Sequence, residues 1–231
     1  MRTLFSQKVT FALLLIYLMG GMGLGGSLVV DHKLLDGVDG FAGEVGHMTI
    51  DPKGPQCNCG NRGCWETFVS PTAIIRRVGE AVIAGPSPQF LMHPDIAGNP
   101  DRIRMEHIVR AAMNGESVVL ETLGEVGRYL GIGIVNLVNV FNPGLVVLGG
   151  ALSLVGPYIL PSAQSEIERR AMVAAQQSIE IKLSAFKFDG GVIGGAALII
   201  QKILGNPTLW SKSLTRIPFE DRVFITANVY A

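Results

Sequence analysis

The sequence predicts an α/β fold, because short apolar runs typical of buried strands alternate with longer segments of helical spacing. Of its 231 residues, 48% are apolar and 16% are charged, which is enough apolar material for a substantial core. The formal net charge is zero, so no overall field favours nucleic acid or an anionic membrane surface. We expect one main domain over residues 1–207 and leave residues 208–231 unassigned.

The first element is an apolar run at residues 11–18, which we interpret as a buried strand. A glycine-rich turn, GMGLGG at 21–26, then leads into a second strand from Ser27 to Asp31. The alternative is a signal peptide, since the chain begins with basic residues before a short apolar stretch. A thiol-rich loop downstream favours the reducing cytoplasm, and the apolar run is too short to span a membrane. We therefore predict a strand in a cytoplasmic protein without a membrane partner.

The exposed amides of Gly23, Gly25 and Gly26 in this turn could cradle a phosphate group. Glycines serve a plain hairpin equally well, so both interpretations stay open here.

After the turn, Met48 to Ile50 is expected to add a short strand, and 67–84 to form a helix. Ser70 is a suitable N-cap for that helix, with Pro71 at its first position. A connector rich in proline and glycine follows at 85–101. We interpret His93 and His107 as ordinary surface residues.

In the remaining chain, predicted helices and strands alternate again. Residues 117–141 carry a wide apolar face, and their glycines at 127, 131 and 133 imply close packing against another element. We also expect this apolar face to support a homodimer. The other expected elements are a helix at 103–113, a strand at 145–148, a helix at 157–171, a strand at 179–186 and a helix at 190–204.

The most informative stretch is GEVGHMTIDPKGPQCNCGNRGCWE, at 43–66. All three cysteines of the protein, Cys57, Cys59 and Cys64, lie within eight residues, and His47 precedes them by ten. Three thiols and one imidazole are the usual ligand set of a closed structural zinc site. The alternatives are buried thiols beside a core histidine, or a disulfide that would leave one cysteine over. We predict structural Zn²⁺ bound by His47, Cys57, Cys59 and Cys64.

Two carboxylates flank this ligand set. Glu44 comes three residues before His47, and Glu66 comes two residues after Cys64. Carboxylates held beside a metal-bound imidazole form a polar pocket that accepts hydrogen bonds from sugar hydroxyls. We predict that Glu44, His47 and Glu66 bind a monosaccharide.

This stretch resembles the signature of the ROK family, which joins bacterial sugar kinases and sugar-responsive transcriptional repressors. The pattern G-E-x-G-H followed by C-x-C-G-x-x-G-C-x-E matches at the histidine, the three cysteines and both glutamates. The resemblance implies that the histidine and cysteines bind zinc and that the glutamates and histidine line the sugar site. It also implies an actin-like (ribonuclease H-like) sugar-kinase lobe, the C-terminal half of that fold, with an inserted zinc loop. The turn at 21–26 is similar to the GTGIGGG phosphate loop of family kinases, with Met22 replacing threonine.

Two functions follow from this resemblance. Family kinases carry a DxGxT loop and an N-D-A-N motif whose aspartate is the catalytic base, and this sequence shows neither. The family's repressors carry an N-terminal winged helix, which we also do not find, so the chain resembles a truncated member. Because GCWETFVSPT is more similar to regulators, we predict the sugar-binding effector portion of a regulator, which would contact DNA only through a segment absent from this chain. The alternatives are an ATP- and Mg²⁺-dependent kinase of glucokinase or N-acetylglucosamine kinase type without its first lobe, and an inactive remnant.

Overall fold

The computed structural model describes residues 14–85 and 88–205. Contacts between Cα atoms divide the chain into two units, 1–188 and 189–231. The first unit holds the sheet, the cysteine-rich loop and all but one of the α-helices described. The described part of the second unit is helix α8 (Gly190–Gly205).

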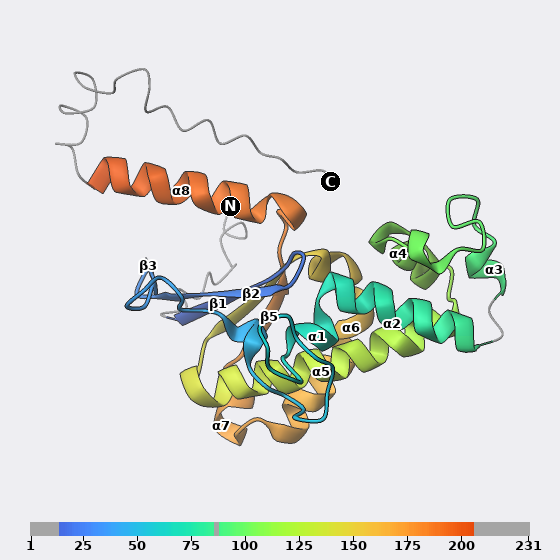
Figure 1. Ribbon diagram of the computed structural model, residues 1–231. Helices are drawn as coiled ribbons and strands as arrows, with labels where there is room; N and C mark the ends of the chain where they lie inside the picture. The colour runs from blue at the N-terminus through green and yellow to red at the C-terminus, as the bar shows by residue number, and fades with distance from the viewer. Residues whose placement is uncertain (1–13, 86–87, 206–231) are drawn as a thin grey trace, which may run out of the picture. The chain divides into compact units, whose positions relative to one another are not determined.

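The first unit contains a five-stranded mixed sheet, in the order β3-β2-β1-β4-β5 (Figure 1). Strands β1 (Leu14–Gly20) and β2 (Leu24–Val30) form an antiparallel hairpin. Strand β1 also pairs in parallel with β4 (Leu145–Gly150), which pairs in parallel with β5 (Glu180–Leu183). The short β3 (Lys33–Leu34) extends the β2 edge.

The predicted hairpin with its glycine turn is confirmed, but its second strand begins earlier than expected. Strand β2 starts at Leu24, so Gly25 and Gly26 lie inside it and not in the turn. In the register of the hairpin, Gly25 lies opposite Met19 and Gly26 lies opposite Leu18. Residues 11–13 of the predicted first strand lie outside the described residues.

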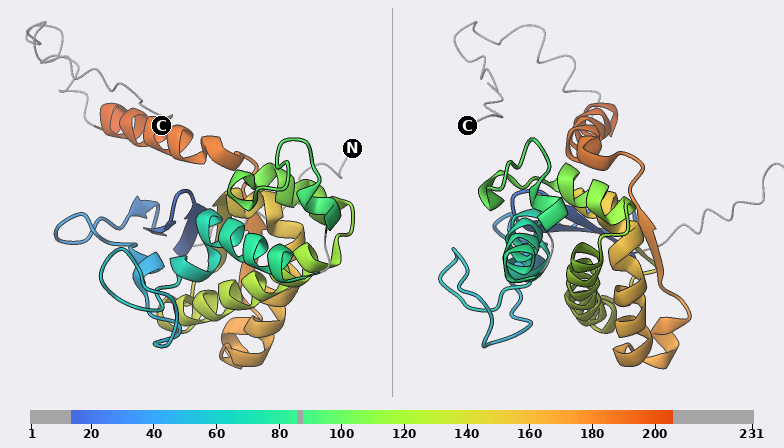
Figure 2. Two further views of the ribbon diagram at one scale, coloured as in Figure 1. Left: turned by 45° about the vertical axis from the view of Figure 1, so that its right-hand side comes forward. Right: turned by 90° about the vertical axis from the view of Figure 1, so that its right-hand side faces the viewer.

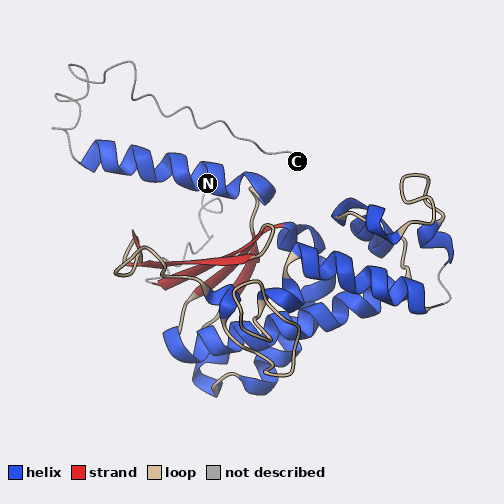
Figure 3. Cartoon of the chain, viewed as in Figure 1, coloured by secondary structure: helices blue, strands red, loops and turns tan. Residues whose placement is uncertain are grey.

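Helices α5 (Ser117–Phe141) and α6 (Ala151–Arg170) pack together on one face of the sheet (Figures 2 and 3). The glycines of α5 make this packing close. A Cβ atom at Gly127 or Gly131 would overlap the α6 backbone at Ile159 or Ala163. The apolar face of α5 is thus buried inside this chain, and it is not free to hold a second copy. Its buried members include Val119, Leu123, Val126, Leu130, Ile134, Leu137 and Val138.

Several predicted helix boundaries were wrong. The helix expected over 67–84 is two helices, α1 (Glu66–Val69) and α2 (Pro71–Ala84), separated by Ser70. The Ser70 hydroxyl accepts a hydrogen bond from the Ala73 amide at 3.2 Å, so the predicted cap is confirmed. Helix α6 begins at Ala151, directly after β4, because Gly150 adopts a positive φ of 62° that turns the chain into the helix.

The remaining elements of the first unit are short. Residues 48–50 form no strand, and Thr49 makes only an isolated bridge to Cys64. Helix α4 (Met105–Met113) follows the connector, which itself contains two brief helical turns, α3 (Pro88–Leu91) and η2 (Pro100–Arg102). The short elements elsewhere are η1 (Val45–His47), α7 (Val173–Gln176) and η3 (Lys187–Asp189).

Within residues 14–85 and 88–205, the segment 187–205 is the one helix long and apolar enough to cross a membrane. Length and composition alone do not assign it to a membrane, because core helices of soluble proteins meet the same criteria.

Candidate functional site

The loop from Thr49 to Cys64 folds back on itself through local hydrogen bonds. The Cys57 amide donates to the Asn61 carbonyl at 2.8 Å, and the Gly63 amide donates to the Pro55 carbonyl at 2.8 Å. Gly63 has a positive φ of 70°, and a Cβ atom there would overlap the Asp51 carbonyl. This backbone requires glycine, and it turns the cysteine side chains towards one another.

The structure brings the four predicted metal ligands together. Nδ1 of His47 lies 3.7 Å from Sγ of Cys57, and Sγ of Cys59 lies 3.6 Å from Sγ of Cys64. One ligand atom from each of the four residues lies within 4.8 Å of the others. Tetrahedral zinc with Zn–S bonds of about 2.3 Å places its ligand atoms roughly 3.5–3.8 Å apart. The side chains therefore fit a tetrahedral ion, and the three cysteines form no disulfide.

The three thiols differ in their acidity. Burial, together with a hydrogen bond to Glu66, raises the pKa of Cys57 to about 12, and its thiol lies 3.0 Å from Oε1 of that glutamate. Burial also raises the pKa of Cys64. A backbone hydrogen bond from Asn61 lowers the pKa of Cys59, which is the exposed one of the three cysteines. Burial therefore disfavours the thiolate form of Cys57 and Cys64, and a nearby cation would act in the opposite direction.

His47 lies between the two predicted carboxylates. Its Nδ1 is 3.5 Å from Oε1 of Glu66, on the side of the cysteines, and its Nε2 is 3.8 Å from Oε2 of Glu44. Glu44 and His47 are exposed, whereas Glu66 is partly buried. Carboxylate oxygens on both sides of an accessible imidazole can accept hydrogen bonds from a polyhydroxyl ligand.

The glycine turn borders this site through Gly23 and Met22. A Cβ atom on Gly23 would overlap Oε2 of Glu66, so the turn lies directly against that carboxylate. The Thr72 hydroxyl of α2 holds the turn in place by donating to the Met22 carbonyl at 2.9 Å. A cavity of about 330 Å³ adjoins them, lined by Met22, Cys57, Glu66, Thr72 and Arg76 among others.

The other two predicted phosphate-binding glycines, Gly25 and Gly26, lie within strand β2. The Gly26 amide donates to the Gly43 carbonyl at 3.0 Å, and Gly25 is part of the β1–β2 ladder. A Cβ atom on Gly26 would overlap Val45, in the segment that carries His47. Gly26 therefore lets the histidine segment approach β2 closely.

Sequence reasoning missed two residues that support the site. Trp65, between Cys64 and Glu66, is fully buried. Asn61 donates from Nδ2 to the Thr49 hydroxyl at 2.7 Å and to Sγ of Cys64 at 3.5 Å. A tryptophan in a loop rich in glycine and proline was an available signal, because such a large apolar side chain seeks a buried position.

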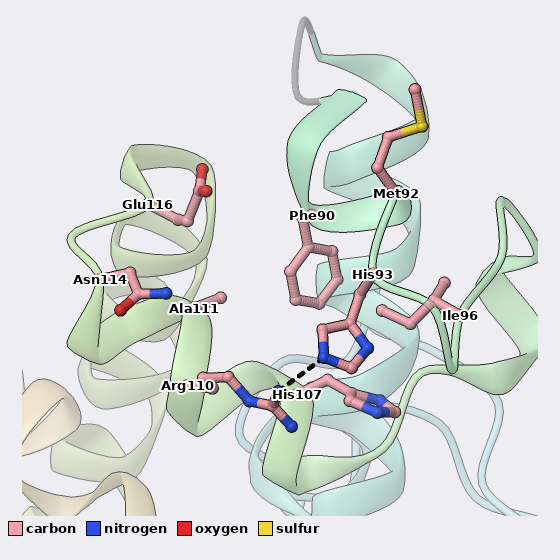
Figure 4. A pocket seen from close by; sticks show the side chains of 9 residues that line it. All are labelled: Phe90, Met92, His93, Ile96, His107, Arg110, Ala111, Asn114 and Glu116. Atoms are coloured by element: carbon pink, nitrogen blue, oxygen red, sulfur yellow. Dashed lines mark hydrogen bonds between the residues drawn. The ribbon is translucent and has the colours of Figure 1, made fainter.

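A second cluster contradicts the interpretation of His107 as a surface residue, whereas His93 is half-buried. His107 is only 6% exposed, and Asp95 lies 3.7 Å from its Nε2 and 3.5 Å from Nδ1 of His93. The two histidines border a separate cavity of about 240 Å³ between α3 and α4 (Figure 4).

This second cluster does not fit a metal ion. Nδ1 of His107 accepts a hydrogen bond from the Arg104 amide at 3.1 Å, so the proton of the neutral ring lies on Nε2. That proton occupies the position that an ion would need. Nε2 of His93 lies 2.6 Å from the guanidinium of Arg110, whose positive charge opposes a cation. The cluster instead fastens the loop after α3 onto α4.

The architecture and the site together define a sugar kinase-like lobe with a cysteine-rich loop. The family model for the ROK family matches residues 6–202. The chain belongs to the ROK family, as the sequence predicted.

Curated relatives fall into both functional branches of the family. The xylose repressor of Caldicellulosiruptor bescii is 36% identical over 193 residues, which cover 84% of this chain and 47% of the repressor. A glucokinase of Halalkalibacterium halodurans is 35% identical over 183 residues, covering 79% of this chain and 54% of the kinase. The chain thus spans about half the length of the curated relatives it matches.

Solved structures show the same division. A ROK glucokinase from Streptomyces griseus, in complex with glucose and AMPPNP, superposes with a TM-score of 0.74 and 29% identity, covering 81% of this chain and 61% of the kinase. A ROK family transcriptional regulator, a homologue of the E. coli MLC protein, superposes with a TM-score of 0.64 and 31% identity, covering 74% of this chain and 41% of the regulator.

Proposed function

We propose that this chain is the carbohydrate-binding effector portion of a ROK-family transcriptional regulator, and that it senses a monosaccharide through a zinc-organised pocket. The observation that carries the proposal is the position of His47, with cysteine sulfur and Glu66 at one ring nitrogen and Glu44 at the other. In this proposal the lobe is the C-terminal half of an actin-like fold. DNA contact belongs to a segment outside this chain.

The residues of the proposed site divide into metal ligands and sugar ligands. His47, Cys57, Cys59 and Cys64 would hold Zn²⁺, which supplies structural cross-linking of the loop and no reaction step. Glu44, Glu66 and the free ring nitrogen of His47 bind the sugar hydroxyls. The cysteine cluster fits a reducing cytoplasm. A homodimer remains a prediction, and it needs a surface other than the apolar face of α5.

D-Xylose and D-glucose are the first ligands to test, because a xylose repressor and glucokinases are among the relatives. Isothermal titration calorimetry of the zinc-loaded protein should show saturable binding of one of them. Light scattering at micromolar concentration should give twice the monomer mass. The absence of heat with a full panel of monosaccharides would contradict the sugar-sensing role.

The second candidate is an ATP-dependent sugar kinase of glucokinase or N-acetylglucosamine kinase type, with Mg²⁺ bound to the nucleotide. The observation in its favour is the close approach of Gly23 to Glu66. Thr72 and Arg76 line the cavity next to this contact. An amide at this position could face a phosphate next to the sugar. Sugar-dependent ADP formation in a coupled assay would support the kinase and count against a role limited to regulation.

A further inference from the structure

Trp65 connects the candidate site to the longest helix of the protein. Its side chain is fully buried, and its indole Nε1 donates to the Tyr129 carbonyl of α5 at 3.0 Å. A Cβ atom on Gly133, one turn further along α5, would overlap the indole ring. The absence of a side chain at Gly133 therefore creates the space that the ring fills, which we call the glycine slot.

The backbone of Trp65 is tied to the other arm of the loop. Its amide donates to the Met48 carbonyl at 2.8 Å, and Met48 directly follows His47. Cys64 and Glu66 flank Trp65 in the sequence. A shift of the indole ring would therefore move a predicted zinc ligand and a predicted sugar ligand on one arm, and strain the link to His47 on the other.

The slot belongs to a rigid part of the molecule. Helix α5 is packed against α6, and the Tyr129 ring stacks on Phe68 with 4.3 Å between centroids. The guanidinium of Arg77 lies 5.4 Å from the centroid of the same ring. These contacts leave little freedom for α5 to retreat, so an added methyl group at Gly133 must displace the tryptophan.

We propose that Trp65 is a positioning residue, and that its fit in the glycine slot sets the placement of Glu66 and Cys64. The inference rests on the proposed sugar-binding function, but its effect on metal retention does not need a sugar. Neither Trp65 nor Gly133 contacts the ligand in this account. They act through the loop that carries the ligating side chains.

The test is Gly133→Ala, with Gly124→Ala as its matched control. Both substitutions remove a glycine from α5, but a Cβ atom at Gly124 meets only the Ser162 hydroxyl at an ordinary 3.6 Å. Trp65→Leu combined with Gly133→Ala provides the rescue, since the smaller side chain leaves space for the methyl group. Trp65→Phe keeps an aromatic ring in the slot and removes the indole N–H. We expect this milder variant to fold even if Gly133→Ala does not.

Two readouts separate positioning from plain stability. The first is the dissociation constant for D-xylose and D-glucose by calorimetry. The second is the rate of zinc release to a colorimetric chelator, measured well below the melting temperature. We expect Gly133→Ala to weaken sugar binding at least tenfold and to speed zinc release, and Gly124→Ala to change neither. The double variant should recover part of both losses, and Trp65→Phe should weaken binding a few-fold.

The positioning role is wrong if folded Gly133→Ala matches Gly124→Ala in both measurements. It is also wrong if adding Trp65→Leu to Gly133→Ala recovers neither sugar binding nor zinc retention. If the unsubstituted protein binds no monosaccharide, the proposed function fails, and the zinc-release comparison still decides the role of Trp65.

Discussion

Two clusters of potential metal ligands lie among the described residues, 14–85 and 88–205, and one of these two fits an ion. In the loop cluster, the Sγ of Cys57 lies 3.7 Å from Nδ1 of His47 and the Sγ atoms of Cys59 and Cys64 are 3.6 Å apart. In the second cluster, His93 and His107 approach Asp95 at similar distances of 3.5 and 3.7 Å. Proximity alone does not distinguish them.

The partner of each ring nitrogen makes the difference. Nδ1 of His107 is committed to the Arg104 amide, which fixes a proton on the nitrogen that faces Asp95. Both ring nitrogens of His47 face carboxylate oxygens, and one also faces a thiol. A carboxylate accepts the proton of the ring nitrogen opposite a metal, so it favours coordination. A backbone amide at the same position opposes it.

Loss of one cysteine should produce the largest effect, which is the loss of most of the bound zinc. We expect the unsubstituted protein to carry about one zinc ion per chain by elemental analysis. Cys64→Ser should lose most of it, because structural sites use all four protein ligands. His93→Ala is the matched control and should keep its zinc. Equal zinc content in both variants would place the ion elsewhere.

Substitution of the carboxylates should weaken sugar binding and leave the metal in place. Glu44→Gln and Glu66→Gln each remove a charged hydrogen-bond acceptor, which contributes about 1.5–3 kcal/mol, or roughly 10- to 100-fold in affinity. Calorimetry with D-xylose and D-glucose measures the loss, and elemental analysis checks the zinc. Unchanged affinity in both variants would remove these glutamates from the site.

Substitution at the second cluster should affect stability alone. His107→Ala removes a buried ring and the hydrogen bond at the start of α4, which we expect to cost about 2 kcal/mol. Chemical denaturation measures this difference, and sugar affinity should not change. A loss of zinc from folded His107→Ala would show that the two clusters are not independent.

A smaller, pH-dependent effect is expected at Glu166 of α6, far from either cluster in the sequence. Its hydrogen bond from Arg169, with a further contribution from Arg170, holds the pKa of this buried carboxyl below its ordinary 4.5. A lowered folded pKa contributes stability above the unfolded pKa, and that stability disappears as the pH falls through the folded value. Glu166→Gln should therefore cost about 1.5 kcal/mol at pH 7 and progressively less below pH 4.5.

Denaturation of both proteins from pH 7 to pH 3 measures this difference. A gap that stays constant over the range would show that the ion pair does not cause the stability.

The loop cluster was predictable because its ligands are close in the sequence. His47 and Cys64 are separated by a loop rich in glycine and proline, so local turns bring them together without help from the rest of the fold. The apolar period of 117–141 likewise predicted a long buried helix. Both features depend on the spacing of residues that are close together in the sequence.

Contacts between distant residues were not predictable in the same way. The fit of Trp65 against Gly133 joins the loop to α5, and the sequence alone does not show which glycine receives the ring. His107 is buried, and its approach to Asp95 in the loop after α3 is a contact that the sequence does not show. The glycine pattern at 21–26 left a phosphate loop and a plain hairpin both open, and it did not show that Gly26 lies against Gly43 and Val45.

We propose that a metal ion holds His47 between two carboxylates that bind a sugar. Calorimetric titration of the protein with its sugar before zinc removal, after chelation, and after return of one equivalent of zinc tests this dependence on the metal. We predict that binding disappears with the metal and returns with it. A metal-free, folded protein that binds the sugar with unchanged affinity would contradict the account.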